Sequence, residues 1–170
     1  MRRIFLSILV AAILVVGGLV GYLYGYEGGL DVAIKDSVGP WAHVTVTFSE
    51  IAAHRNGKAA DEGWDNVTMT QRSIDLASFV NVSALMASAR FGPGSYTELR
   101  IDVIAAQGQM ANGTSVTFTV PSGEVKTATP FEIRSGATTT LTVDIDLSRS
   151  IVVNGTGWIF TPVLGQVTVG

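Results

Sequence analysis

Two aspartates close together on an expected strand are the first candidates for a chemical site. Asp144 and Asp146 lie two residues apart in TTTLTVDIDL, so both carboxylates point to the same face of a strand. With another acidic side chain nearby they would suit Ca²⁺, which takes about six to eight oxygen ligands. Like charges on a solvated strand face are also common without a metal, and no DxDxDG loop is present. Calcium at this pair is the only cofactor that the sequence suggests.

The histidines and serines give no catalytic arrangement. His43 and His54 are the only histidines and lie eleven residues apart in one strand segment. At roughly 3.3 Å per residue they are too far apart to share a metal. Ser49 or Ser122 can be combined with a histidine and an aspartate on paper, but neither has a GxSxG context. We therefore expect no enzyme, with His54 at a strand end and His43 facing solvent.

The aromatic residues offer a binding role and a packing role. Indole faces suit the apolar side of a sugar ring, so Trp41, Trp64 and Trp158 are candidates for a carbohydrate platform. Tryptophans in a small β domain also serve in the core or at strand edges, and no spacing singles out a platform. Tyr96 follows PGS before a long strand, which favours a packing residue similar to a tyrosine corner.

Four of the five asparagines begin an N-x-Ser/Thr sequon. These are Asn66, Asn81, Asn112 and Asn154, and only Asn56 lacks the arrangement. Sequons are acceptors for N-glycosylation at the surface of exported domains. Asn-Gly is also a favoured turn pair, so chance in a Thr-rich β protein is the alternative. We predict these four asparagines as candidate glycosylation sites, without a signal for which of them carry sugar.

The chain begins with a segment suited to a membrane. Ile4 to Tyr26 carries no charge, follows Arg2 and Arg3, and ends in three tyrosines. A helix of this length spans roughly the 30 Å hydrocarbon layer of a bilayer. Basic residues mark the cytoplasmic side and tyrosines suit the interface. The segment therefore predicts a single-pass anchor with the N-terminus inside and the domain outside.

Two other leaders would also export the domain. A cleaved secretory signal fits the charged start, but the apolar run is long and no A-x-A site follows it. A pilin-type leader would need a small residue after the basic pair, where Ile4 stands. In the cleaved cases the domain is secreted or held at the cell surface.

Composition limits the partners. The 170 residues include no cysteine, so an exported domain would depend on packing and strand pairing instead of disulfides. From Gly28 onward, nine Lys/Arg face thirteen Asp/Glu, a net charge of about −4 without a basic patch. Nucleic acid is not an expected partner.

Period-two alternation of apolar residues dominates the chain after Gly28 and predicts strands. One segment differs: the spacing of apolar residues from Phe79 to Arg90 predicts a short amphipathic helix, closed by Gly92-Pro93-Gly94. The fold class is therefore an antiparallel β-sandwich with one internal helix, preceded by a transmembrane helix. We expect an anchor or signal helix over residues 1–27 and an extracellular domain over residues 28–170.

The order of motifs resembles an uncharacterised family of exported prokaryotic β-sandwich domains, found in archaeal surface proteins and bacterial lipoproteins. The motifs GGLDVAIKD, PGSY, VPSGEVK and DIDLSRSI carry the likeness, which extends over almost all of residues 30–169. The resemblance implies a plan similar to transthyretin-like and immunoglobulin-like sandwiches, and no activity. Two features depart from it: no lipobox cysteine is present, and Val38-Gly39 is inserted before Pro40.

Two functions follow as hypotheses. The first is a non-enzymatic, membrane-anchored surface domain that serves in an envelope or filament, with the closing segment TPVLGQVTVG able to pair with another copy by strand addition. That segment would equally serve to complete its own sheet. The second is a module that binds glycans or another envelope polymer.

Overall fold

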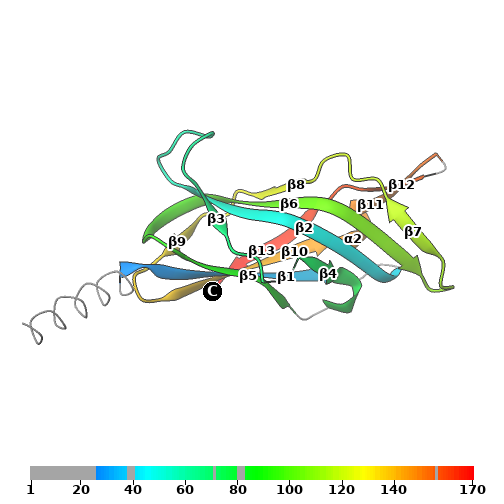
Figure 1. The fold of residues 1–170 in the computed structure, drawn as a ribbon, viewed down its shortest axis with the longest axis horizontal. Helices are drawn as coiled ribbons and strands as arrows, with labels where there is room; N and C mark the ends of the chain where they lie inside the picture. Colours follow the sequence, from blue (N-terminus) through cyan, green and yellow to red (C-terminus); the bar gives the residue numbers. More distant parts are fainter. Residues whose placement is uncertain (1–25, 38–40, 71, 80–82, 156) are drawn as a thin grey trace, which may run out of the picture.

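The computed structural model describes residues 26–37, 41–70, 72–79, 83–155 and 157–170 (Figure 1). Ile4 and most of the predicted anchor, the Val38-Gly39 insertion and Asn81 lie outside these residues. In the part that is described, no helix is both long enough and apolar enough to cross a membrane. The anchor therefore stays a prediction from the sequence.

The described residues form strands in two main sheets. The four-stranded sheet, here sheet A, has the order β13-β10-β1-β5. Its strands are β1 (Gly28–Ser37), β5 (Ala84–Phe91), β10 (Thr138–Asp146) and β13 (Leu164–Val169).

The seven-stranded sheet, here sheet B, is built on two long strands, β2 (Trp41–Arg55) and β6 (Gly94–Met110), which pair along almost their whole length. Five short strands pair with these two, and they are β3 (Trp64–Val67), β4 (Ser73–Asp75), β7 (Ser115–Phe118), β8 (Glu124–Thr127) and β9 (Phe131–Ile133). A separate hairpin, β11 (Ile151–Asn154) with β12 (Gly157–Phe160), follows the single turn of helix α2 (Leu147–Ser150).

The two sheets share one hydrophobic core, as in a β-sandwich. The alternation predicted for TTTLTVDIDL is confirmed, because Leu141, Val143 and Ile145 are fully buried while the residues between them are partly exposed. Sheet B contributes the opposite wall, including Val46 and Phe48. Burial of alternate apolar side chains from both sheets is the main stabilising contribution in such a fold.

One strand pair corrects the antiparallel prediction. β1 and β10 run parallel, in register from Gly29 with Thr138 to Ser37 with Asp146. Parallel neighbours need a long crossover connection, and here the chain passes through sheet B between the two strands. The other pairs in the named sheets are antiparallel.

The helix predicted from Phe79 to Arg90 is wrong over most of its length. Ala84–Phe91 is strand β5, and only a 3-10 turn, η1 (Leu76–Phe79), precedes it. The register of β5 against β1 shifts between Val32 and Ala33, and a bulge of this kind breaks the period of two. Met86 and Ala87 are consequently both buried, which produces helix-like spacing in a strand.

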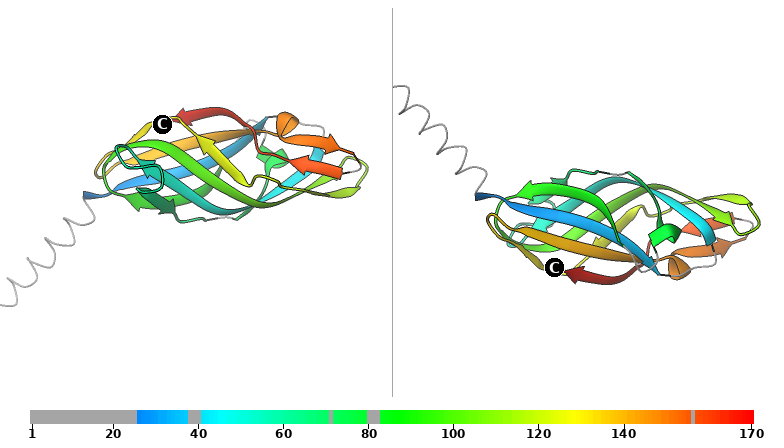
Figure 2. Two further views of the ribbon diagram at one scale, coloured as in Figure 1. Left: turned by 90° about the horizontal axis from the view of Figure 1, so that it is seen from above. Right: turned by 90° about the horizontal axis from the view of Figure 1, so that it is seen from below.

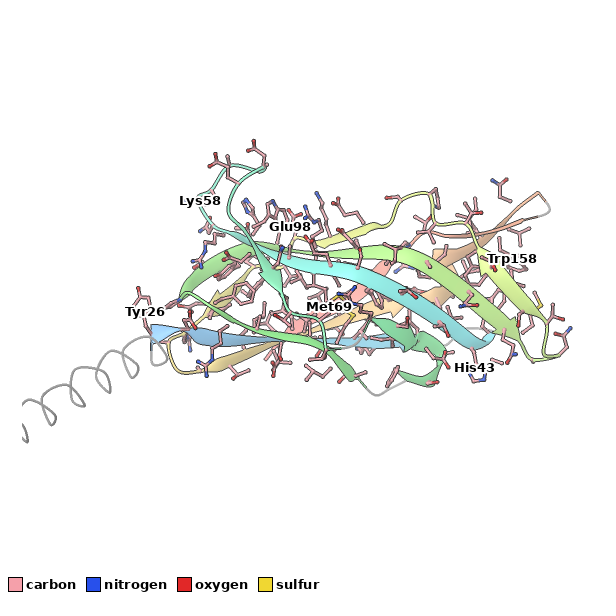
Figure 3. All side chains as sticks on the ribbon, in the orientation of Figure 1. Tyr26, His43, Lys58, Met69, Glu98 and Trp158 are labelled. Atoms are coloured by element: carbon pink, nitrogen blue, oxygen red, sulfur yellow. The ribbon has the colours of Figure 1, made fainter. Side chains whose placement is uncertain are left out.

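The domain has two distinct ends. Tyr26, which precedes β1, lies at one end, and Trp158 on the β11–β12 hairpin lies at the other (Figure 3). The two views in Figure 2 also place the start of β1 and this hairpin at opposite ends. Any site at the hairpin end therefore lies far from the end at which the predicted anchor joins the domain.

Candidate functional site

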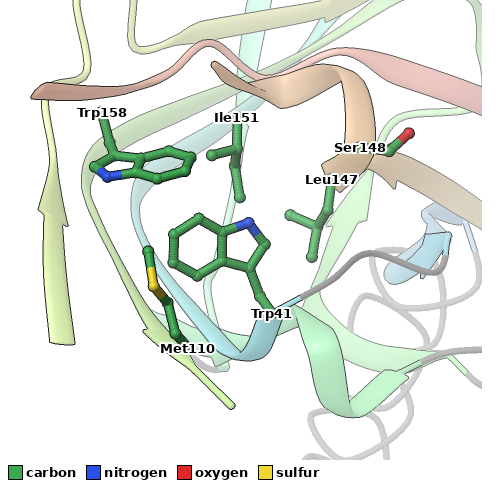
Figure 4. Close-up of a pocket in the computed structure, with 6 residues that line it drawn as sticks. All are labelled: Trp41, Met110, Leu147, Ser148, Ile151 and Trp158. Atoms are coloured by element: carbon green, nitrogen blue, oxygen red, sulfur yellow. The ribbon is translucent and has the colours of Figure 1, made fainter. Parts of the chain in front are cut away.

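An apolar cavity opens at the hairpin end of the domain (Figure 4). Its volume is about 360 Å³. Six residues line it: Trp41, Met110, Leu147, Ser148, Ile151 and Trp158. Cavities of this size, lined mostly by apolar and aromatic side chains, are the usual form of binding sites.

Trp41 begins β2 and forms one wall of the cavity. Its ring meets Phe118 edge to face, with 5.1 Å between centroids, and it meets Trp158 in the same way at 5.0 Å. Gly108 on β6 makes room for this cluster, because a Cβ there would lie 2.6 Å from Phe118 Cζ and 2.8 Å from the Trp41 ring. The first wall is thus held by aromatic packing against sheet B.

Helix α2 and the hairpin form the other wall. Asp146 caps α2, since its carboxylate accepts hydrogen bonds from the backbone N–H of Arg149 (3.2 Å) and from the Ser148 hydroxyl (2.6 Å). Leu147 begins α2, Ile151 begins β11 directly after it, and both side chains line the cavity. The hairpin turn contains Gly155 at φ +60°, a conformation that glycine adopts readily.

The polar side chains of helix α2 beside the cavity already have partners. The Arg149 side chain also donates to Asp146, with 2.7 Å between Nε and Oδ2. Hydrogen bonds from Ser148 and Arg149 hold the pKa of Asp146 below its ordinary value. The only hydroxyl among the lining side chains is thus already engaged, and the cavity is suited to an apolar group.

Asp144 and Asp146 do not gather further acidic ligands. Asp144 lies 3.9 Å from Lys35 Nζ, and Asp146 serves as the helix cap. No group of three or more His, Cys, Asp or Glu side chains able to hold a metal occurs within the described ranges. The described residues therefore supply no third acidic ligand for calcium beside Asp144 and Asp146.

The two histidines serve different structural contacts. His43 is exposed and lies 2.6 Å from Asp75, whose carboxylate also accepts from Ser78 and from the backbone N–H of Val44. Burial alone would raise the pKa of Asp75, but these hydrogen bonds outweigh it and lower the pKa. In a catalytic triad the serine bonds to the histidine, which in turn bonds to the aspartate. Ser78 bonds to Asp75 instead, so His43 is not placed as a base for this serine.

His54 is buried and contacts Thr97 Oγ1 at 3.2 Å and the Ala59 carbonyl at 2.9 Å. It lies near the end of β2, as predicted. Ser49 is placed by a 3.5 Å hydrogen bond to the Asp102 carbonyl.

Trp64 stands apart from the other two tryptophans, on the outer face of sheet B. The Arg100 guanidinium lies 4.6 Å from the centre of its ring and Lys126 lies 6.0 Å away. A second cavity of about 250 Å³ adjoins it, lined by polar side chains that include Glu98 and Lys126. Glu98 Oε1 is buried there without a hydrogen bond.

Tyr96 is confirmed as a buried packing residue. Its hydroxyl donates to the Gly92 carbonyl four residues earlier (3.1 Å) and approaches Asp65 (3.3 Å). Burial, together with the nearby Asp65 carboxylate, raises the pKa of Tyr96 to about 12. The phenol is therefore protonated at physiological pH and acts as a hydrogen-bond donor.

The described sequon asparagines are exposed. Asn66 lies on β3, Asn112 in the β6–β7 turn and Asn154 in the hairpin. Asn112 accepts a hydrogen bond from the backbone N–H of Thr114 within its own turn (3.0 Å). The predicted glycosylation positions are thus accessible wherever the structure describes them.

The apolar cavity was not predicted from the sequence. The sequence offers the three tryptophans as candidates for one platform, but the fold brings together only Trp41 and Trp158, which are separated by most of the chain. A local signal existed, since each of the two lies beside a Gly-containing turn and so at a strand end. Nothing in the spacing indicates that the two strand ends meet.

Fold and site together define an all-β domain of two packed sheets with an apolar cavity at one end. The chain belongs to the family described as domain of unknown function DUF4382, which matches residues 27–162. The resemblance to an uncharacterised family is confirmed to that extent.

Other comparisons add little. No curated protein matches the chain. Among solved structures, the chain is similar to a protein from Bacteroides ovatus that is proposed to serve in cell adhesion, with 12% identity and a TM-score of 0.27. The match covers 84% of this chain, which spans about 44% of that protein's structure. A likeness of this size carries no argument about function.

Proposed function

We propose that this chain is a non-enzymatic cell-surface domain that an N-terminal membrane segment holds in place and that works through contact with other envelope components. The observation that carries the proposal is the placement of Tyr26 and the Trp41–Trp158 cavity at opposite ends of the domain. A segment anchored next to Tyr26 leaves the cavity facing away from the membrane.

Three further features support a surface role. The described sequon asparagines are exposed, as an exported glycoprotein requires. The histidines and the capping aspartate take part in structural contacts. Strand β13 lies at the edge of sheet A without a charged residue or a proline, so it could pair with another copy in an assembly.

Site-directed labelling tests the location and orientation. The chain contains no cysteine, so a single introduced cysteine reports on its own position. We expect a membrane-impermeant maleimide to label Asp61→Cys, in the exposed loop after β2, on intact cells. The matched variant Arg2→Cys should react only after permeabilisation. Labelling of Asp61→Cys only in lysed cells would contradict a surface location.

Binding of an envelope glycan is a second candidate, and the cavity beside Trp64 favours it. An indole there adjoins polar side chains, including Glu98, whose buried Oε1 makes no hydrogen bond and lies 3.8 Å from Lys126 Nζ, and sugars bind where an aromatic face meets polar groups. A glycan array with the wild-type chain and Trp64→Ala tests this function, with Trp158→Ala as the control. Equal binding by both variants and the wild type would place any glycan elsewhere.

A further inference from the structure

The hairpin beside the apolar cavity has one open backbone edge. On β12, the Trp158 carbonyl accepts from Thr119 N–H and the Phe160 N–H donates to the Thr119 carbonyl, each at 2.9 Å. Alternate residues of a strand turn their backbone groups to opposite sides. The bonds between β12 and β11 therefore run through the pair Ile159 and Val152.

It follows that Val153 on β11 turns its N–H and C=O away from β12. Within the part of the chain that the structure describes, no strand pairs with that side of β11. Strand edges in native proteins are commonly protected by charge, proline or a covering element. The sequence Ile151–Asn154 carries neither charge nor proline.

The side chains next to this edge continue the apolar cavity. Ile151 and Val153 share one face of β11, and Ile151 lines the cavity. Val153 is 61% exposed on that face, whereas Val152 is 48% exposed on the opposite face. An added strand would place alternate side chains above the cavity, beside Ile151 and Val153.

We propose that the free edge of β11 and the Trp41–Trp158 cavity together form a docking site for an extended, uncharged segment of a partner protein. The segment adds as a strand to β11 and inserts one large apolar side chain into the cavity. Main-chain hydrogen bonds supply affinity in this mode of recognition, and the pocket for a side chain supplies specificity.

The chemistry of the cavity selects this occupant. Its lining is apolar apart from two indole N–H groups and Ser148, whose hydroxyl is already bonded to Asp146. None of the lining residues is charged, so a charged side chain would be desolvated there without a partner of opposite charge, which is costly. This docking site rests on the proposed surface role and adds the class of partner. The peptide-binding test below is independent of the cysteine labelling that tests the surface location.

Synthetic peptides test the site on the full-length chain in lipid nanodiscs, which avoid free detergent that would fill the cavity. The probe is a seven-residue peptide of threonine and glutamine with one central leucine, blocked at both ends and followed by fluorescence polarisation. We expect the leucine peptide to bind, and peptides with central alanine or aspartate to bind about 10-fold more weakly or worse.

Backbone methylation separates strand addition from simple filling of the cavity. Two leucine peptides are N-methylated, one on the odd residues and one on the even residues. Because a strand faces its neighbour with alternate amides, we expect one of the two to lose binding and the other to retain it. Equal affinity of both for the chain would overturn strand addition.

Two valine variants form a matched pair on the protein. Val153→Lys places a charge on the cavity face of the open edge and should weaken the leucine peptide about 10-fold or more. Val152→Lys adds the same charge on the opposite face and should leave affinity unchanged. Both positions are exposed, so neither change removes a core contact.

Other results would overturn the proposal. They are binding of no peptide at all, or equal loss of affinity in both lysine variants. Self-association that Val153→Lys abolishes, without peptide binding, would identify a second copy as the occupant. Competition by a neutral oligosaccharide, with no effect of the central peptide residue, would identify a glycan.

Discussion

At the scale of single residues, polar contacts around a buried tyrosine fix the ends of the long strands. Tyr96 is fully buried, its hydroxyl reaches Gly92 and Asp65, and the Arg55 guanidinium lies 5.1 Å from the centre of its ring. Arg55 in turn donates to Asp65 at 2.8 Å. The cluster ties the end of β2 to the start of β6, opposite the end that carries the cavity.

Removing the Tyr96 hydroxyl should destabilise the domain. We expect Tyr96→Phe to lower the free energy of unfolding by about 1 kcal/mol, because the Gly92 carbonyl and Asp65 lose a buried donor. Urea denaturation measures the change. In an Asp65→Asn background the cost should be smaller, and an unchanged cost would show that Asp65 does not couple to the hydroxyl.

A side chain at Gly108 should destabilise the domain. In Gly108→Ala the new methyl group would lie 2.6 Å from Phe118 and 2.8 Å from Trp41, so the aromatic cluster must move, at about 1–3 kcal/mol. Thermal unfolding and the tryptophan fluorescence spectrum should both change. Gly157→Ala is the control, since a Cβ there would meet only the Asn154 carbonyl, at 3.7 Å. Equal effects of the two variants would contradict the packing argument.

Asp75 should contribute to acid sensitivity. Its pKa is lowered in the folded chain, so its stabilising contribution is fully present above the unfolded value of about 4 and is lost as the pH falls through the folded value. Asp75→Asn should therefore destabilise the chain at neutral pH and make less difference in acid. Chemical denaturation at pH 7 and at about pH 3 measures this, and a constant difference would exclude the linkage.

At the scale of elements, edge strands decide where the domain can associate. The segment Thr68–Thr70 covers the edge of β5 that faces away from β1. Thr70 N–H donates to the Met86 carbonyl, and Ser88 N–H donates to the Thr68 carbonyl. The end of β7 reaches β12 through Thr119. In sheet A, β13 occupies the other edge.

If β13 mediates assembly, a charge on it should prevent assembly. Thr168 is exposed on β13 and lies opposite Thr142 of β10. We expect Thr168→Lys to remove higher oligomers in analytical ultracentrifugation and ordered structures in electron micrographs of cell surfaces. Thr117→Lys, an exposed position on β7, is the control. Oligomers that persist in Thr168→Lys would exclude β13 as the assembly edge.

The sequence predicted strands better where the alternation is regular than where it is interrupted. Strand β10 followed from its alternation because each inward residue meets the core directly. Strand β5 was missed because its bulge against β1 places Met86 and Ala87 in the interior together. The parallel pairing of β1 and β10 has no local signal at all, since it depends on the path of the intervening chain.

At the scale of the whole molecule, the exposed sequons extend over different surfaces. Asn66 lies on sheet B, whereas Asn112 lies in the β6–β7 turn and Asn154 ends β11 next to the hairpin turn, both at the end that carries the cavity (Figure 1). Glycans at those two turns would stand near the cavity and leave the Tyr26 end uncovered. A bulky glycan at either position would restrict access to the cavity end, so glycosylation limits which partners can reach it.

The mass of the native chain tests whether the exposed sequons carry glycans. If the chain is exported and glycosylated, Thr68→Ala and Thr114→Ala should each remove the mass of one glycan, because each deletes the hydroxyl residue of an exposed sequon. Intact-mass spectrometry of the native chain measures the loss. Asn56→Gln is the control, since Asn56 is exposed but begins no sequon. A native mass equal to that of the bare polypeptide would contradict glycosylation, and the cysteine labelling would then decide the location alone.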